Sequence, residues 1–212
     1  MSTNQSETVA VYADFVCPFC YLGRASLNRY RDGREADLEV DWRFFDLRAQ
    51  KRGPDGEIDD SVDDGKDEAY FEQVRENVAR LREEYGAEEM LDLDGTPDVD
   101  SWDAQQAALF VKREHDAATF RAFYDAVIDA YWTEGREIGD VDVLADLAAD
   151  AGLDPDPIRA ATEDEELAAE LRSRFEETRQ RGVTGVPTFV ADGRTARGAV
   201  PPSHLERLVE GS

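Results

Sequence analysis

The chain has 212 residues, of which 41% are hydrophobic, enough to bury the core of one large domain or of a small domain with an insertion. Acidic residues outnumber basic ones by 49 to 24, giving a formal net charge of −25, and no basic stripe is present that could neutralise the phosphates of a nucleic acid. No apolar run approaches the roughly 20 residues that span a bilayer, and residues 1–16 do not resemble a signal peptide. We therefore expect a cytoplasmic protein with neither nucleic-acid nor membrane partners.

The N-terminal region predicts a strand, a helix and a second strand. Residues 8–16 alternate and then run apolar, as in a buried strand. Apolar residues then recur at helical spacing from Tyr21 to Tyr30, and residues 38–47 predict the second strand. This order is typical of a βαβ unit, and the glycine- and aspartate-rich residues 51–67 predict an exposed loop after it.

The middle of the chain is predicted to be helical, because apolar residues recur there with a period of 3.6. The predicted helices run from Tyr70 to Tyr85, after the cap Ser101, from Phe120 to Tyr131, after Asp140, after Asp154, and from the capping box Thr162–Glu165 to Gly182. We expect their aromatic side chains to pack in the core. Gln105 and Gln106 are candidates for polar groups that line a pocket.

Strand character returns only near the C-terminus. Residues 185–200 predict two short strands joined by a turn at Asp192-Gly193, and a last helix contains Leu205 and Leu208. This pattern predicts an α/β domain formed by residues 7–60 and 163–212. An inserted α-helical domain, residues 61–162, divides it.

The acidic residues are spread over all the predicted helices. Such self-repulsion is best tolerated in high salt, where the Debye length falls to about 3 Å at 1 M. Lysine is rare, since only Lys51, Lys66 and Lys112 accompany the arginines. We interpret this composition as halophilic; an acidic surface that recruits a cationic partner is the alternative.

Both cysteines lie where the first strand meets the first helix, in DFVCPFCYLG (14–23). A thiolate in the first turn of a helix is stabilised by free backbone N–H groups and by the positive end of the helix dipole, and Cys17 falls there. Pro18 suits the same turn because it lacks an N–H. Cys20 lies one turn further on and faces inward. Cys17 is therefore the candidate nucleophile and Cys20 the resolving thiol.

Two other interpretations of the cysteine pair stay open. A structural zinc needs four ligands, and the two histidines, His115 and His204, lack ligand spacing to each other or to the cysteines. That leaves a zinc shared between two chains. The thiols could also be inert core residues, which would not explain their place at a helix start. We expect no metal and no cofactor beyond the redox-active pair.

The segment GVTGVPTFV (182–190) supplies a second element. Pro187 follows glycines and precedes a predicted strand, a position that proline tolerates. If the Val186–Pro187 peptide bond is cis, the turn presses the backbone of Val186 against the thiols and offers its N–H and C=O to a substrate chain. An ordinary trans bond is the alternative.

These motifs resemble the DsbA family of the thioredoxin superfamily, particularly its cytosolic FrnE-like branch. The resemblance rests on residues 14–23, 131–154, 182–190 and 198–208, which together nearly span the chain. It implies a thioredoxin fold with a helical domain inserted between an N-terminal βαβ part and a C-terminal ββα part. It also implies disulfide exchange with protein or peptide substrates and with a cytosolic reductant or oxidant. In that activity Cys17 is the nucleophile, Cys20 the resolving thiol and Val186-Pro187 the cis-proline loop.

Two positions depart from the family pattern. Phe19 stands where DsbA has a histidine, so we predict a less activated Cys17 and a weaker oxidant. Val11 stands where thioredoxin and DsbA carry an acidic residue. Asp14 is a candidate substitute in proton transfer, or else a cap or an exposed loop residue. A carboxylate so close would oppose thiolate formation.

A sister branch of the family implies other functions. Kappa-class transferases and 2-hydroxychromene-2-carboxylate isomerases carry serine at the position of Cys17 and bind glutathione, which makes glutathione a candidate co-substrate. A third alternative is a non-enzymatic chaperone with an apolar groove lined by Phe15, Phe19 and Tyr21, which are also the candidate substrate-binding side chains. A homodimer is left open.

Overall fold

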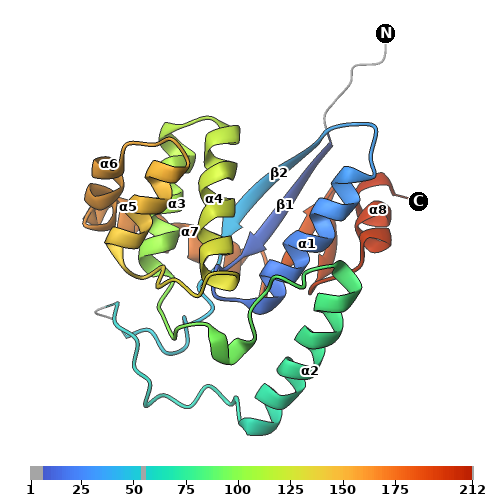
Figure 1. The fold of residues 1–212 in the computed structure, drawn as a ribbon, viewed down its shortest axis with the longest axis horizontal. Helices are drawn as coiled ribbons and strands as arrows, with labels where there is room; N and C mark the ends of the chain where they lie inside the picture. The colour runs from blue at the N-terminus through green and yellow to red at the C-terminus, as the bar shows by residue number, and fades with distance from the viewer. Residues whose placement is uncertain (1–6, 54–55, 212) are drawn as a thin grey trace.

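Four strands form one sheet in the order β2-β1-β3-β4 in the computed structural model, which describes residues 7–53 and 56–211 (Figure 1). β1 (Glu7–Ala13) and β2 (Leu38–Phe44) are parallel, joined by α1 (Pro18–Asp32). β3 (Thr188–Ala191) and β4 (Arg194–Arg197) are antiparallel to their neighbours and are followed by α8 (Pro202–Glu210). This βαβ and ββα order confirms the predicted α/β fold.

The segment between β2 and β3 is helical, as predicted. It contains α2 (Glu68–Tyr85), η1 (Leu93–Gly95), α3 (Trp102–Glu114), α4 (Ala117–Trp132), α5 (Val141–Asp150), α6 (Pro155–Thr162) and α7 (Glu165–Gln180). Figure 1 shows α3 to α6 as a group beside β2, with α1 and α8 on the other side of the strands and α2 next to α1. α7 contacts both β2 and α3. The division of the chain at residues 60 and 163 stays a prediction.

Two predicted helix caps are wrong. Ser101 precedes α3 but makes no capping hydrogen bond, because its hydroxyl donates to the buried carboxylate of Asp14 instead. Thr162 is the last residue of α6, and its hydroxyl donates to the carbonyl of Arg159. The N-cap of α7 is Asp164, which accepts from two backbone N–H groups of the first turn.

Side chains of α3 and α7 close the outer edge of β2. Lys112 Nζ donates to the carbonyl of Trp42 at 2.5 Å, and Thr178 Oγ1 donates to the carbonyl of Phe44 at 3.1 Å. Gln105 Nε2 donates to the carbonyl of Phe45 at 3.1 Å. These bonds satisfy backbone acceptors that an edge strand would otherwise present to other chains.

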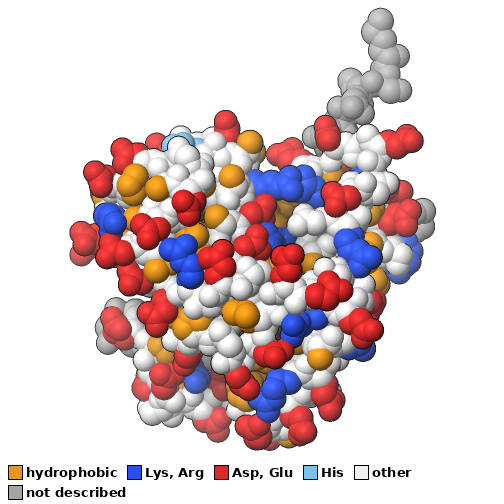
Figure 2. Space-filling view, viewed as in Figure 1, with side chains coloured by type: hydrophobic (Ala, Val, Ile, Leu, Met, Phe, Trp, Pro, Cys, Tyr) orange, Lys and Arg blue, Asp and Glu red, His pale blue; other side chains and the backbone are white. Residues whose placement is uncertain are grey.

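The sheet and the inserted helices share one hydrophobic core. Val9 of β1, Leu27 of α1, Ile128 of α4 and Leu171 of α7 are at most 1% exposed and belong to the same buried cluster. Acidic side chains dominate the face drawn in Figure 2 and are spread over it, with basic ones between them. Among the described residues no helix is both long and apolar enough to cross a membrane.

Candidate active site

Cys17 lies at the N-terminal end of α1. β1 ends at Ala13, and Cys17 is the N-cap residue, followed by Pro18 at the first helical position. The Cys17 backbone N–H donates to the carbonyl of Asp14 at 3.2 Å, which closes the turn between strand and helix. The Cys17 side chain makes no cap hydrogen bond and therefore stays available for chemistry at the positive end of the helix.

Cys20 lies one turn further along α1, and both cysteines are free thiols. Cys20 is 1% exposed and Cys17 is 3% exposed. Burial raises the pKa of Cys20 well above its ordinary value, and the neighbouring Cys17 thiol raises it further. The Cys20 thiol is therefore protonated at neutral pH, and its deprotonation requires a base.

The Val186–Pro187 segment lies against Cys17. Its peptide bond is cis, and the Cys17 thiol donates to the carbonyl of Val186 at 3.7 Å. The N–H of Val186 has no hydrogen-bond acceptor in the described part of the chain. The carbonyl of Val186 thus lies at the thiol, and the N–H of the same residue is free to donate.

Gly23 allows this close approach. A Cβ atom on Gly23 would lie 3.0 Å from Cγ of Pro187 and 3.1 Å from Cζ of Phe189, which is tighter than ordinary packing permits. Gly23 lies within the cysteine motif, and its place in the sequence predicts no particular role for it. Nothing local in the sequence reveals that a ring from residue 187 packs on this face of α1.

Asp14 is buried rather than exposed, and it does not cap a helix. Its carboxylate accepts hydrogen bonds from the Ser101 hydroxyl at 2.6 Å, from the Leu47 N–H at 2.8 Å and from the Val16 N–H at 3.3 Å. Burial raises the pKa of Asp14 to about 6, although these hydrogen bonds oppose the shift. Asp14 can therefore gain or lose a proton near neutral pH.

Gln105 fixes the direction of the Ser101 hydroxyl. Its Nε2 donates to Ser101 Oγ at 3.0 Å, so the serine proton points to Asp14. Gln105 and Gln106 are each 1% exposed and line none of three cavities between the described residues; their role as pocket-lining groups stays a prediction. Gln106 instead donates to the carbonyls of Ala161 and Asp164 and holds α6 to α3.

Two of the three aromatic substrate-binding candidates lie in the core. Phe15 is 1% exposed with its ring 4.8 Å from that of Tyr124, and Tyr21 is 6% exposed beside Trp132. The groove predicted for a chaperone therefore lacks two of its walls. Phe19 alone is half-buried, which leaves part of its ring at the surface beside the cysteines.

No group of three or more His, Cys, Asp or Glu side chains is arranged to hold a metal ion among the described residues. His115 caps the end of α3 and His204 lies in α8. The cysteine pair, Asp14 and the Val186–Pro187 turn remain as the chemically competent groups. They are suited to thiol chemistry.

The comparisons place the chain in a known family. Residues 8–210 match the DSBA-like thioredoxin domain, and the chain belongs to this family. It is 28% identical over 203 residues to the uncharacterised protein YwbO of Bacillus subtilis, which covers 95% of this chain and 94% of YwbO.

Solved structures share the fold. A probable DsbA oxidoreductase of Streptomyces coelicolor superposes with a TM-score of 0.74 at 24% identity, covering 97% of this chain and 89% of that one. A 2-hydroxychromene-2-carboxylate isomerase gives 0.72 at 18% identity, covering 96% and 93%. The cytosolic disulfide reductase DsbM of Pseudomonas aeruginosa gives 0.58 at 21% identity, covering 89% and 87%. At these identities the likeness concerns the fold.

Proposed function

We propose that the protein is a thiol–disulfide oxidoreductase acting on protein or peptide substrates. The observation that carries the proposal is the Cys17 thiol, which lies at the mouth of α1 within hydrogen-bonding distance of the Val186 carbonyl and one turn from Cys20. Membership of the DSBA-like family supports it. The cycle closes through a cytosolic thiol or disulfide, for which glutathione is a candidate.

The reduction of a substrate needs two exchanges. The Cys17 thiolate attacks one sulfur of the substrate disulfide, forming a mixed disulfide and releasing the other substrate sulfur as a thiolate. Cys20 then loses its proton and attacks the Cys17 sulfur. The Cys17–Cys20 disulfide forms, the second substrate thiol leaves, and two electrons have passed to the substrate. Oxidation of a dithiol substrate is the same sequence reversed.

Asp14 is the proposed proton acceptor for Cys20. Burial and the Cys17 thiol raise the pKa of Cys20, so a base is needed for the second exchange. The pKa of Asp14, about 6, leaves its carboxylate mostly ionised at neutral pH. Ser101 is a positioning residue in this scheme, because its hydroxyl holds Asp14 and comes from α3 of the inserted segment.

The substrate is proposed to lie along Val186 as an extended segment. The unpartnered N–H of Val186 and its carbonyl provide one donor and one acceptor beside the Cys17 sulfur. The half-buried ring of Phe19 provides apolar contact. Because Phe19 cannot hydrogen-bond to the thiolate, we continue to predict a weaker oxidant than a protein with histidine at this position.

Trapping of the mixed disulfide tests the proposal. Cys20→Ser should accumulate a mixed disulfide with a peptide substrate that contains a disulfide bond. Cys17→Ser should form no such complex and should no longer reduce insulin. The complex is detected by mass spectrometry without reductant. Equal complex formation by both variants would contradict the assigned order of attack. Glutathione-dependent isomerisation or conjugation retained in Cys17→Ser, with no insulin reduction in the wild type, would favour the isomerase and transferase branch.

A further inference from the structure

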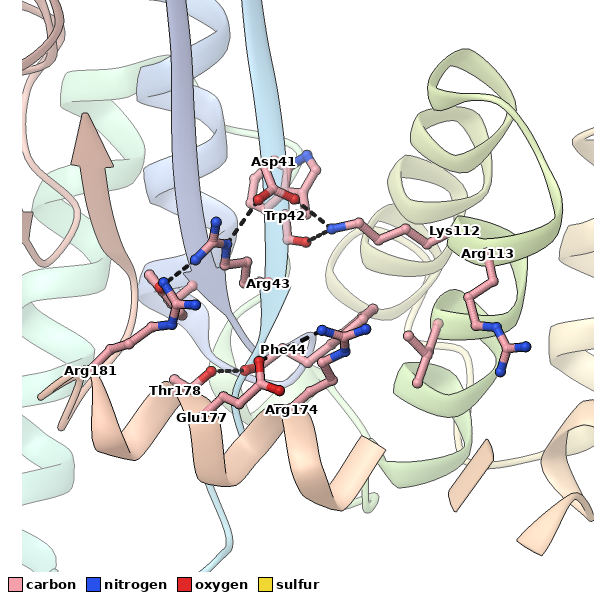
Figure 3. A pocket seen from close by; sticks show the side chains of 12 residues that line it. Asp41, Trp42, Arg43, Phe44, Lys112, Arg113, Arg174, Glu177, Thr178 and Arg181 are labelled. Carbon is pink, nitrogen blue, oxygen red and sulfur yellow. Dashed lines mark hydrogen bonds and ion pairs between the residues drawn. The ribbon is translucent and has the colours of Figure 1, made fainter. Parts of the chain in front are cut away.

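A pocket of about 360 Å³ lies at the edge of β2, between that strand, α3 and α7 (Figure 3). None of the residues that line it belongs to the cysteine motif or to the Val186–Pro187 turn. We propose that this pocket binds a small organic phosphate, that is, a phosphomonoester with an apolar group attached.

The charge of the lining is opposite to that of the protein. Five basic and two acidic side chains surround the pocket: Arg43, Lys112, Arg113, Arg174, Arg181, Asp41 and Glu177. The whole chain has only 24 basic residues and a net charge of −25. Such a concentration of cations costs repulsion between them, which an anion between them would relieve.

The acids of the pocket hold some of the cations in place. Asp41 accepts from Arg43 Nε at 2.8 Å and from Lys112 Nζ at 2.6 Å. Glu170, which lies outside the lining, pairs with both Arg113 and Arg174. These four cations are therefore positioned before any ligand arrives, which lowers the entropic cost of binding.

Hydrogen-bond donors in the pocket exceed the acceptors. Arg43 Nη1 donates to the Tyr12 phenol oxygen at 2.8 Å. Because a guanidinium can only donate, the phenol oxygen is the acceptor, and its own O–H finds no acceptor among the described residues. Tyr12 is 3% exposed, so water does not fully replace that partner.

Arg181 supplies a cation with no partner of its own. It follows α7 and is exposed, and its side chain makes no ion pair or hydrogen bond within the part of the chain that the structure describes. Figure 3 shows its side chain reaching from the end of α7 toward Arg43. Two guanidinium groups and a phenol O–H thus line the same pocket, and donors of this kind bind phosphate groups.

The pocket has room for more than a phosphate. Leu109 of α3 and Phe44 of β2 contribute an apolar wall beside the cations, and a volume of about 360 Å³ falls within the usual range of small-molecule sites. An inorganic ion would leave the wall uncovered. An organic group on the phosphate would cover it.

Isothermal titration calorimetry of the full chain tests the proposal, with phenyl phosphate, inorganic phosphate and succinate as probes. A constant concentration of about 0.5 M KCl screens loose charge attraction while convergent hydrogen bonds persist. We expect saturable binding of one phenyl phosphate, at least tenfold tighter than either other probe. Arg181→Ala should weaken it about tenfold or more, consistent with loss of one charge-assisted contact.

Arg207→Ala is the matched control, because Arg207 of α8 is also exposed and its side chain has no partner among the described residues, but it lies outside the pocket. It should bind phenyl phosphate like the wild type. Circular dichroism checks that both variants fold. Absence of saturable binding, equal affinity of Arg181→Ala and wild type, or succinate binding as tightly as phenyl phosphate would overturn the proposal. Inorganic phosphate binding as tightly would overturn the organic part of it.

Discussion

Replacement of Asp14 by asparagine should change how stability depends on pH. Burial raises the pKa of this carboxyl from its ordinary value of 3.8 to about 6 in the folded protein. An acid whose pKa is raised on folding binds more protons in the folded state than in the unfolded state between these values. The folded protein therefore loses stability as the pH rises from 3.8 to 6, and the loss persists above 6. At ~1.4 kcal/mol per pH unit, the full loss is about 3 kcal/mol.

The assay is urea unfolding of wild type and Asp14→Asn at several pH values in constant high salt. The difference in free energy of unfolding, variant minus wild type, should rise by about 3 kcal/mol between pH 3.5 and 7. Because the other acidic residues are the same in both proteins, their contributions to the pH dependence of stability cancel in this difference. Asparagine has one oxygen and one NH2 group where Asp14 has two oxygens, so at least one donor around residue 14 loses its acceptor and the variant is less stable than the wild type at low pH. Its stability has no pH-dependent contribution from residue 14. Asp37→Asn, at an exposed position, is the control. A difference that stays flat across this range would refute the raised pKa and with it the proposed proton acceptor.

Three other substitutions or conditions have defined outcomes. Gly23→Ala should lower the free energy of unfolding by about 1–3 kcal/mol and slow disulfide exchange, because its Cβ would meet the Pro187 ring. Gly33→Ala, whose Cβ would have no heavy atom nearer than 3.6 Å, should do neither. Urea unfolding and an insulin reduction assay measure the two effects. Arg24→Ala should cost about 2 kcal/mol in urea unfolding, because it removes the buried cation between Asp125 and Asp129, and Arg24→Lys should recover part of that loss. The unfolding temperature should rise with KCl as the Debye length falls from about 10 Å to about 3 Å, and a temperature that is the same at 0.1 M and 1 M would contradict the halophilic interpretation.

The elements of the fold could be predicted because their signals are local. The apolar alternation in β1 and the 3.6-residue period of the helices each depend on a few neighbouring positions. The place of Cys17 follows in the same way, since the helix begins with Pro18 a few residues after the strand ends, which makes Cys17 the residue at the N-terminal end of the helix.

The contacts that adjust the site could not be predicted, because they join distant segments. Ser101 carries the ordinary sequence signal of a helix cap, and only the packing of α3 on the turn after β1 turns its hydroxyl toward Asp14, 87 positions away. By contrast, the local alternation and helical period already account for the burial of Phe15 and Tyr21, which flank the motif in sequence. The cations of the pocket come from β2, α3 and the end of α7, and no short window contains them.

The covered edge of β2 makes the helical segment hard to remove. Lys112 and Thr178 occupy the carbonyl groups of Trp42 and Phe44 in the strand, and Gln105 occupies that of Phe45 just after it. In a shortened protein that kept only the sheet, α1 and α8, those carbonyl groups would be exposed along a strand rich in apolar residues. The exposed strand could then pair with the same strand of another copy. Shortening this chain in evolution or in the laboratory would therefore require a second change that protects the strand.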